Sequence, residues 1–292
     1  SLPALATATG HLAARMTGAY GYVRQQFGMS IGKFEGVQES LARIGGFTYS
    51  LEAMRVMTAG AIDMKLSPSV VTAIAKYHMT EMSRTLMNDA FDIHAGRAIQ
   101  VGPKNYLAHG YMGIPISITV EGANILTRNL MIFGQGATRC HPYVLKELEA
   151  AANPDSEAGL KHFDELLLKH VGFALGNTFG ALFQGLTAGA FNKSPVAGET
   201  AQYYKQLTRM SNGLALCADF SMLMLGGDLK RKEMLSARLG DVLSHLYIAS
   251  AVLKFYEDNG RQVADLPFVH YSVQRNLYEI GRAFAGFLSN FP

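Results

Sequence analysis

Apolar residues recur every three to four positions along most of the chain, the spacing that places them on one face of a helix. In the first half, this pattern predicts helices over about 4–27, 37–65, 69–94 and 121–137. In the second half, it predicts helices over about 157–191, 197–226, 229–258 and 268–289. The alternation of apolar and polar residues that marks a strand is nearly absent. The sequence therefore predicts an all-α protein.

Two interruptions organise this helical pattern. The segment AAANPDSEAG, residues 150–159, places Pro154 among small and polar residues that are typical of a linker. We therefore expect an up-down four-helix bundle over residues 1–150 and an additional helical domain over 155–292. Within the bundle, a loop is expected from 95 to Pro115. Because a helical pattern begins almost at residue 1, we also expect the chain to be a piece of a longer protein.

Composition narrows the class of protein. The 292 residues are 49% hydrophobic and 17% charged with a net charge of +3, which is typical of a soluble protein with a substantial core. No dense stripe of Lys and Arg is present, so we expect no nucleic-acid partner. The two cysteines, Cys140 and Cys217, are isolated and indicate a reducing compartment, which favours a cytoplasmic protein.

One segment is apolar enough to raise the question of a membrane. The stretch HVGFALGNTFGALFQGLTAGAF, residues 170–191, is interrupted by Asn177, Gln184 and several glycines. It therefore lacks the uninterrupted apolar span of ~20 residues that a transmembrane helix needs. We interpret it as a buried or interface helix, and a peripheral position on the inner face of a membrane stays open.

Glu121, in the stretch ITVEG, is a single carboxylate among apolar neighbours. Burial among apolar side chains would raise the pKa of the carboxyl group, which is the condition for a general base near neutral pH. Gly122, which follows, would let another molecule approach the backbone. The alternative is a carboxylate at a helix start, stabilised by the helix dipole and paired with Lys104 or Arg128.

Two further segments carry candidate binding residues. In YVRQQFG, Arg24 and Gln26 could bind a phosphate while Phe27 stacks on a ring, or the segment could simply end a helix with Phe27 as a core anchor. In DIHAGR, the small residues Ala95 and Gly96 could let the backbone approach a cofactor, or could form an ordinary irregular loop.

The histidines do not predict a metal site. His94, His109, His141 and His162 are too widely separated to form a metal-binding motif. We expect each to be hydrogen-bonded in the interior or exposed at the surface.

Three segments taken together resemble one family in order and spacing. YVRQQFGMSIGKFEGVQ, DIHAGRAIQVGP and ITVEGANILTR are similar to the C-terminal helical domain of the acyl-CoA dehydrogenases. That family has Arg-x-x-Phe-Gly at the end of its first helix, a glycine-bearing loop after its third, and then a Glu-Gly-Thr/Ala-Asn signature. The later segment LSARLGDVLSHLYIASAVLKFYED is similar to the large bacterial fatty-acid β-oxidation members, which carry an extra helical region.

The resemblance implies roles for the candidate residues. Glu121 would remove the α-proton of a fatty acyl-CoA thioester while the β-hydride passes to FAD. Arg24, Gln26 and Phe27 would contact the FAD of a neighbouring subunit, which implies a homo-oligomer. The family's usual electron acceptor is electron-transfer flavoprotein.

Smaller residues complete the implied site. Ala95 and Gly96 would line the adenosine-pyrophosphate side of FAD. Gly122 and Asn124, together with Arg128, would support the flavin or the loop of the base.

The chain also departs from the family pattern. Asp92 stands where many relatives have Gln, Ala95 replaces a glycine, and Arg97 replaces a small polar residue. Val120 replaces the aromatic residue before the base, and Ala123 replaces Thr. These changes concern flavin contacts and leave the base in place.

The family's N-terminal helical domain and middle β-barrel are not found in this sequence. We therefore expect the chain alone to be inactive and colourless. A different class of function, a non-catalytic helical module for oligomerisation or for docking on a membrane or partner, fits residues 155–292 as well.

Overall fold

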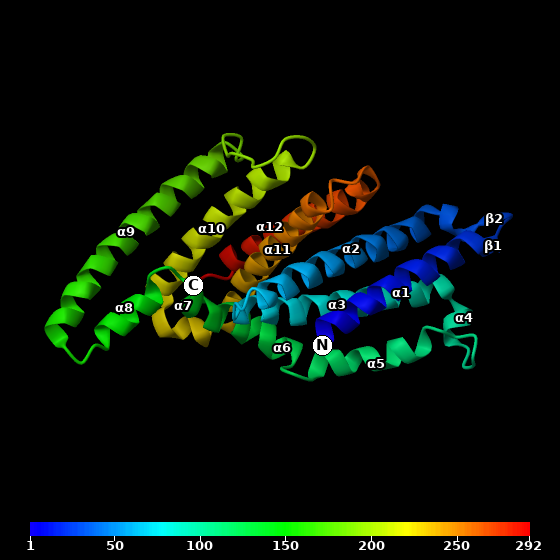
Figure 1. The fold of residues 1–292 in the computed structure, drawn as a ribbon, viewed down its shortest axis with the longest axis horizontal. Helices are drawn as coiled ribbons and strands as arrows, with labels where there is room; N and C mark the ends of the chain where they lie inside the picture. Colours follow the sequence, from blue (N-terminus) through cyan, green and yellow to red (C-terminus); the bar gives the residue numbers. More distant parts are fainter. The chain divides into compact units, whose positions relative to one another are not determined.

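The structure is a computed structural model that describes all 292 residues. It is all-α, as the sequence predicts, apart from one two-stranded hairpin (Figure 1). In the first part of the chain the elements are α1 (Leu2–Val23), β1 (Gln25–Gln26), β2 (Met29–Ser30), η1 (Ile31–Lys33), α2 (Glu35–Asp63), α3 (Ser69–His94), α4 (Gly96–Ile99), α5 (Ala108–Thr119), α6 (Asn124–Leu126), the π-helical η2 (Thr127–Gln135) and α7 (Gly136–Cys140).

The second part contains four long helices and shorter connecting elements. They are α8 (Val144–Ala151), α9 (Ser156–Leu186), α10 (Ala201–Leu225), η3 (Gly226–Lys230), α11 (Glu233–Asp258), η4 (Val263–Asp265) and α12 (Leu266–Leu288). The four long helices correspond closely to those expected from the apolar spacing.

The chain forms two compact units that do not follow a single cut in the sequence. The first contains Ser1–Thr127 and Tyr247–Asn276, and the second contains Arg128–Leu246 and Leu277–Pro292. The chain returns to the first unit because α11 and α12 each contribute to both. The compact units therefore contain other residue ranges than the predicted regions, 1–150 and 155–292.

The first unit has a core of three long helices, with α1, α2 and α3 running side by side (Figure 1). Arg43 on α2 holds Asp89 on α3 through two hydrogen bonds of 2.7 Å, from Nε and Nη2 to the carboxylate oxygens. Two glycines of α2 let the later segment approach closely. A Cβ on Gly45 would lie 2.7 Å from the ring of Phe268, and one on Gly46 would lie 2.1 Å from the ring of Tyr271.

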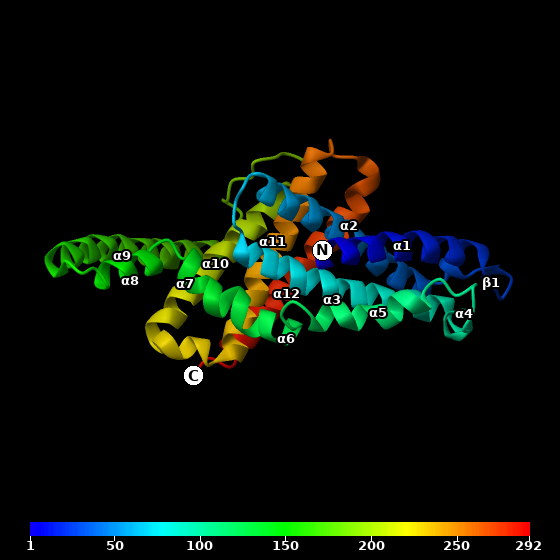
Figure 2. The same ribbon diagram turned by 60° about the horizontal axis from the view of Figure 1, so that its bottom comes forward.

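The second unit has a core in which Phe133, Leu235, Leu239 and Phe287 are buried together with Leu229. In the same unit, α8 and α10 lie along α9 (Figure 2). The guanidinium of Arg128 donates two hydrogen bonds to the carboxylate of Asp241 on α11, which joins η2 to that helix.

Two expectations for the first part were wrong. The loop expected up to Pro115 contains the helix α5, although Pro115 lies inside it and a proline within a helix costs ~3 kcal/mol or more. Packing outweighs that local cost, because Leu107 and Ile114 are buried beside α3. The single helix expected over 121–137 is a loop followed by α6, η2 and α7.

Candidate active site

Glu121 lies in the loop between α5 and α6, in an unusual backbone conformation. Its φ is +54°, and Gly122 follows with a φ of +89°. The left-handed region costs an ordinary L-residue about 1–2 kcal/mol, so a glutamate stays there only when its surroundings hold it. Non-glycine residues in such conformations cluster at functional sites.

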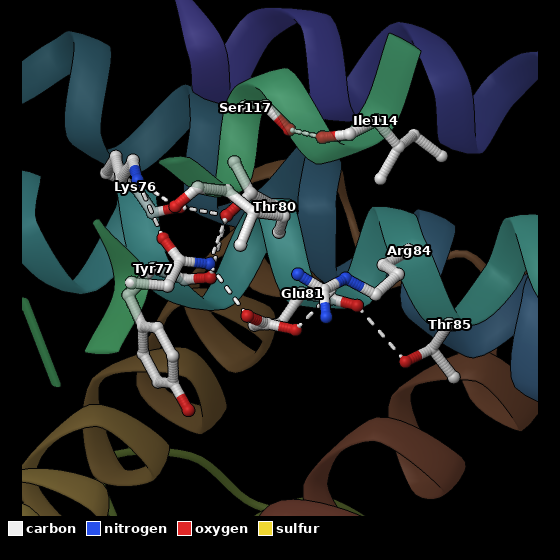
Figure 3. A network of polar contacts seen from close by, with 10 residues as sticks. Lys76, Tyr77, Thr80, Glu81, Arg84, Thr85, Ile114 and Ser117 are labelled. Atoms are coloured by element: carbon white, nitrogen blue, oxygen red, sulfur yellow. Dashed lines mark hydrogen bonds and ion pairs between the residues drawn. The ribbon is translucent and has the colours of Figure 1, made fainter. Parts of the chain in front are cut away.

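Lys76, on α3, forms the hydrogen bonds that hold this loop. Its side chain is only 8% exposed, and its Nζ donates hydrogen bonds to the carbonyl of Gly122 at 2.7 Å, to Oδ1 of Asn124 at 2.7 Å and to the carbonyl of Ile118 at 3.3 Å. Figure 3 shows Lys76 and its neighbours on α3 within this network. One buried cation therefore fixes the backbone on both sides of Glu121.

Burial also acts on the charge of Lys76. Desolvation lowers the pKa of its ammonium group, and the nearby negative charges of Glu121 and Glu81 oppose that shift. Lys76 was not predicted from the sequence. A lysine within the apolar pattern of 69–94 was the available signal, but its partners are more than forty positions away in the sequence.

Asn124 completes the network, and its side-chain amide is used on both sides. Oδ1 accepts from Lys76, while Nδ2 donates to Oγ1 of Thr80 at 3.0 Å and to Oε1 of Glu81 at 2.8 Å. Asn124 was expected to support either the flavin or the loop of Glu121. Its hydrogen bonds within this chain support the loop.

The expected burial of Glu121 is wrong for this chain. Glu121 is exposed and forms no hydrogen bond or ion pair through its side chain, so the alternative pairing is not present either. The apolar side chains around it are exposed as well; they include Ile116, Val120, Ile125 and Leu126. Because these side chains are not buried, the apolar residues near Glu121 in the sequence do not enclose its carboxylate.

The backbone of the loop has unused donors. No hydrogen bond within the chain uses the N–H groups of Glu121 or Gly122. The loop thus presents an exposed carboxylate and free N–H donors on one fixed backbone segment, an arrangement that can remove a proton and bind a developing oxyanion.

The second candidate segment forms a tight hairpin after α1. Gln25 and Gln26 pair with Ser30 and Met29, and the turn between them has positive φ at Phe27 and Gly28. Phe27 is 91% exposed, so the interpretation as a core anchor is wrong. A fully exposed aromatic ring at a rigid turn is available to stack on another molecule.

The structure brings this hairpin together with the third candidate segment. Arg24, Gln26, Phe27, Ala95 and Gly96 line one cavity of about 590 Å³. Ala95 has a φ of +48°, and the space around the Cα of Gly96 is open, so the backbone is accessible to a bound group.

Arg97 also lines this cavity and was noted from the sequence only as a departure. Arg24 and Arg97 are both exposed, and neither forms an ion pair within the chain. Two guanidinium groups, an exposed ring and an open backbone fit a group that carries phosphates and an aromatic ring, as FAD does.

His94 forms part of the wall of this cavity. Its Nδ1 donates to the carbonyl of Ala90 at 2.7 Å, its Nε2 accepts from the hydroxyl of Tyr106, and its ring stacks on Tyr20 at 4.2 Å. Burial lowers the pKa of His94, the hydrogen bond to Ala90 opposes the shift, and the charge of Arg97 adds to it. Burial and the nearby Arg97 thus favour the neutral imidazole.

The predicted residues fall into two groups at opposite ends of α3. Lys76, beneath Glu121, precedes Ala95 by nineteen positions, which corresponds to about 28 Å along a helix of 1.5 Å rise per residue. We call the cavity lined by Arg24 and Arg97 the arginine cavity. In one chain, the carboxylate of Glu121 and the arginine cavity therefore lie far apart.

The histidines behave as expected from the sequence, with one cluster that it did not predict. His109 and His162 are exposed. His141 accepts backbone N–H groups at Nδ1, so its Nε2 carries the hydrogen that it donates to Asp219 at 2.8 Å. His170 donates from Nδ1 to Glu147 at 2.8 Å. The side chains of His141, His170 and Asp219 lie close enough together to hold a metal ion. Their hydrogen bonds form a network that joins α8, α9 and α10.

Comparison with known proteins identifies the family. Residues 138–292 match the family model described as acyl-CoA dehydrogenase, C-terminal, bacterial type, and residues 3–133 match the acyl-CoA dehydrogenase C-terminal domain. The first match alone covers more than half of the chain. The chain therefore belongs to the acyl-CoA dehydrogenase family, and the resemblance seen in the sequence is confirmed.

Individual relatives agree with the assignment. The chain is 22% identical over 267 residues to proteins named probable acyl-CoA dehydrogenase FadE10 from Mycobacterium bovis and Mycobacterium tuberculosis, an alignment covering 86% of this chain and 39% of each relative. Its fold is similar to that of an acyl-CoA dehydrogenase complexed with FAD from Bacillus anthracis, with a TM-score of 0.72, 17% identity and coverage of 97% of this chain and 47% of that chain. The chain thus spans less than half the length of these relatives.

Proposed function

We propose that the protein to which this chain belongs is a flavin-dependent dehydrogenase that oxidises fatty acyl-CoA at its α,β bond in β-oxidation, with Glu121 as the base. The observation that carries the proposal is the conformation of Glu121. The backbone of Glu121 is strained and its carboxylate is exposed, while the buried Lys76 holds the loop, whose N–H groups at Glu121 and Gly122 are free. Family membership supplies the reaction class, and the geometry supports a base at this position.

The chain's own residues would act on the thioester end of the substrate. The α-proton of a thioester is weakly acidic, so the carboxylate of Glu121 must be aimed at it and the enolate oxygen must be stabilised. The free N–H of Glu121 can donate a hydrogen bond to that oxygen. FAD, when bound, supplies the acceptor for the β-hydride. The exposed apolar surface around Glu121 would be covered by acyl chain or by another part of the protein, which excludes water from the base.

The arginine cavity would bind a flavin nucleotide of a neighbouring subunit. Arg24 and Arg97 would pair with the pyrophosphate, Phe27 and Gln26 would contact the rings, and the backbone at Ala95 and Gly96 would approach closely. Its separation of about 28 Å from the loop of Glu121 supports the assignment of the two groups to different FAD molecules. This arrangement requires a homo-oligomer.

Further partners follow from the family. We propose electron-transfer flavoprotein as the electron acceptor and a cytoplasmic location with peripheral contact to the inner face of the membrane. Because the chain spans under half of its relatives, we expect it to be inactive and colourless when isolated. The additional helical domain can still serve as a docking module, since α9 exposes a long apolar face.

The test is the steady-state oxidation of acyl-CoA by the full-length enzyme. Glu121→Gln should abolish turnover and leave FAD content nearly unchanged, because loss of a general base costs ~10²-fold or more. Glu39→Gln, an exposed site on α2, is the matched control and should be as active as the wild type. A Glu121→Gln enzyme that retains more than about a tenth of wild-type turnover would remove Glu121 from this role.

A further inference from the structure

Helix α9 carries its apolar side chains on the side that faces away from its neighbours. The exposed positions recur at helical spacing and range from 50% exposed at Val171 to 89% at Leu186. We call these residues the outer face of α9: Leu168, Val171, Leu175, Phe179, Leu182 and Leu186. An ordinary surface helix of a soluble protein has the opposite arrangement, with its apolar stripe toward the core.

In the apolar part of α9, residues 171–186, the polar side chains Asn177, Thr178 and Gln184 are less exposed than the leucines of the outer face. His170 bonds Glu147 on α8, and the Thr178 hydroxyl donates to the carbonyl of Ala174. Nδ2 of Asn177 and Oε1 of Gln184 are buried without a hydrogen-bond partner. Polar side chains are thus turned inward at a cost, while leucine and phenylalanine face outward.

The outer face is also wide. With Leu167, Phe183, Gly172 and Gly176, which are exposed as well, it covers about half of the circumference of a helix with 3.6 residues per turn. A seam that receives one partner helix is narrower than this. The width favours a continuous apolar medium over a single helix of a second chain.

Charge is distributed unevenly along the α9–α10 hairpin. Residues 171–192 contain no ionisable side chain. The end where the two helices are connected has a net positive charge, with Lys193 and Glu199 in the connection and Lys205 and Arg209 in the first turns of α10. Nζ of Lys205 donates to the carbonyl of Ala190, which places that ammonium group at the connection.

The other end of the hairpin carries most of the acidic side chains together with three lysines. The acidic residues are Glu147, Glu149, Asp155, Glu157, Asp164, Glu165 and Asp219, and the lysines are Lys146, Lys161 and Lys169. An apolar helix face with basic residues at one end is typical of segments that lie in the interface of an anionic membrane.

We propose that the outer face of α9 and the basic α9–α10 connection bind the surface of a bilayer that contains anionic phospholipid. Helix α9 is the one helix long and apolar enough to cross a membrane by length and composition, and only 6% of its most apolar window is buried. Its inner side packs on α8 and α10, so we assign it to the interface and not to a span. The inference rests on the membrane contact proposed above and is independent of the dehydrogenase activity.

The test is flotation of the full-length protein with vesicles of phosphatidylcholine, with and without phosphatidylglycerol. The wild type should float with the anionic vesicles. In the double variant Leu175→Ser, Phe179→Ser, membrane partitioning should fall at least about tenfold for each substitution. Each substitution removes one apolar side chain that the bilayer would bury. Met234→Ser on α11 removes an apolar side chain that is 69% exposed outside this face and should bind as the wild type does.

A second pair of variants tests the charge. Lys193→Gln and Lys205→Gln should each weaken binding to the anionic vesicles about fivefold and leave binding to phosphatidylcholine unchanged. Circular dichroism and FAD content should match the wild type in every variant, which excludes unfolding as the cause.

Three results would overturn the inference. A wild type that floats with neither vesicle excludes the membrane contact altogether. A wild type that floats, with outer-face variants that float equally well, excludes this surface alone. If the outer-face variants separate subunits in analytical ultracentrifugation without changing flotation, the face is an interface between copies of the chain.

Discussion

At the scale of single residues, Lys76 is the group on which the geometry of the candidate base depends. Burial of its ammonium group is unfavourable because the charge loses contact with water. Hydrogen bonds to carbonyl and amide oxygens on both sides of Glu121 offset this loss. The strained φ of Glu121 persists because this lysine and Asn124 fix the loop. If Glu121 is the base, as proposed, Lys76 acts as its positioning residue.

Lys76→Met should reduce kcat of the full-length enzyme by between about ten- and a hundredfold with little change in KM, because small displacements of a catalytic group have effects of this size. FAD content should stay unchanged, since the arginine cavity is at the other end of α3. Lys104→Met, at an exposed lysine, is the control. Equal kcat in Lys76→Met and wild type would show that the loop holds Glu121 without the lysine.

His94 should make the stability of the chain depend on pH. Burial lowers the pKa of His94 in the folded state below the ordinary value of 6.5. As pH falls below about 6.5 the unfolded state takes up a proton that the folded state resists, so the free energy of unfolding decreases. Above that pH the contribution of His94 is fully present.

The measurement is urea unfolding of the chain between about pH 7.5 and pH 5. His94→Gln should remove part of the slope, which for one group is at most about 1.4 kcal/mol per pH unit. His109→Gln, at an exposed histidine, should leave the slope as it is. Parallel curves for the wild type and His94→Gln would contradict the neutral, buried state of this imidazole.

At the scale of elements, close approach between helices depends on particular glycines. Gly46 on α2 leaves room for the ring of Tyr271, because a Cβ would lie 2.1 Å from that ring. Gly60 on the same helix has open space around it. The two positions separate the effect of packing from that of helix propensity.

Gly46→Ala should destabilise the chain by about 1–3 kcal/mol through overpacking. Gly60→Ala should stabilise it by about 0.5–1 kcal/mol, because alanine favours a helix. Thermal or urea unfolding of both variants gives the comparison. A stabilising Gly46→Ala would mean that α2 and the segment around Tyr271 are not packed as described.

Much of this element structure could be predicted from the sequence, and the reasons for the exceptions are physical. The helices 69–94 and 157–191 were predicted because their apolar spacing is regular and proline is absent. Helix α5 was not predicted, since Pro115 signals a break and the packing of Ile114 on α3 is a tertiary effect. The interpretation of 170–191 as a buried or interface helix was wrong as to burial, because spacing identifies an apolar face without showing what covers it.

The residues proposed for the site come from the sequence, but the residues that support them do not. Glu121, Arg24 and Phe27 were singled out because their segments match a family in order and spacing. The contacts of Lys76 and the place of Arg97 in the cavity depend on segments far apart in the sequence. The expected burial of Glu121 was wrong because its apolar neighbours do not belong to the core of the first unit.

At the scale of the whole molecule, the proposed function requires more than one chain. The loop of Glu121 and the arginine cavity lie at opposite ends of α3, so a subunit would use its own base on one FAD and its arginines on another. The matched relatives are more than twice as long as the aligned chain, and their remaining parts would complete each flavin site.

The proposed removal of the α-proton by Glu121 can be measured separately from electron transfer to the acceptor. Acyl-CoA of several chain lengths is added anaerobically to the full-length, FAD-containing protein, and the visible absorbance of the flavin is followed in a single turnover. The wild type should bleach with at least one chain length, while Glu121→Gln should keep its flavin and bleach at least ~10²-fold more slowly. Bleaching of Glu121→Gln at the wild-type rate, or a wild type that no acyl-CoA bleaches, would contradict the account.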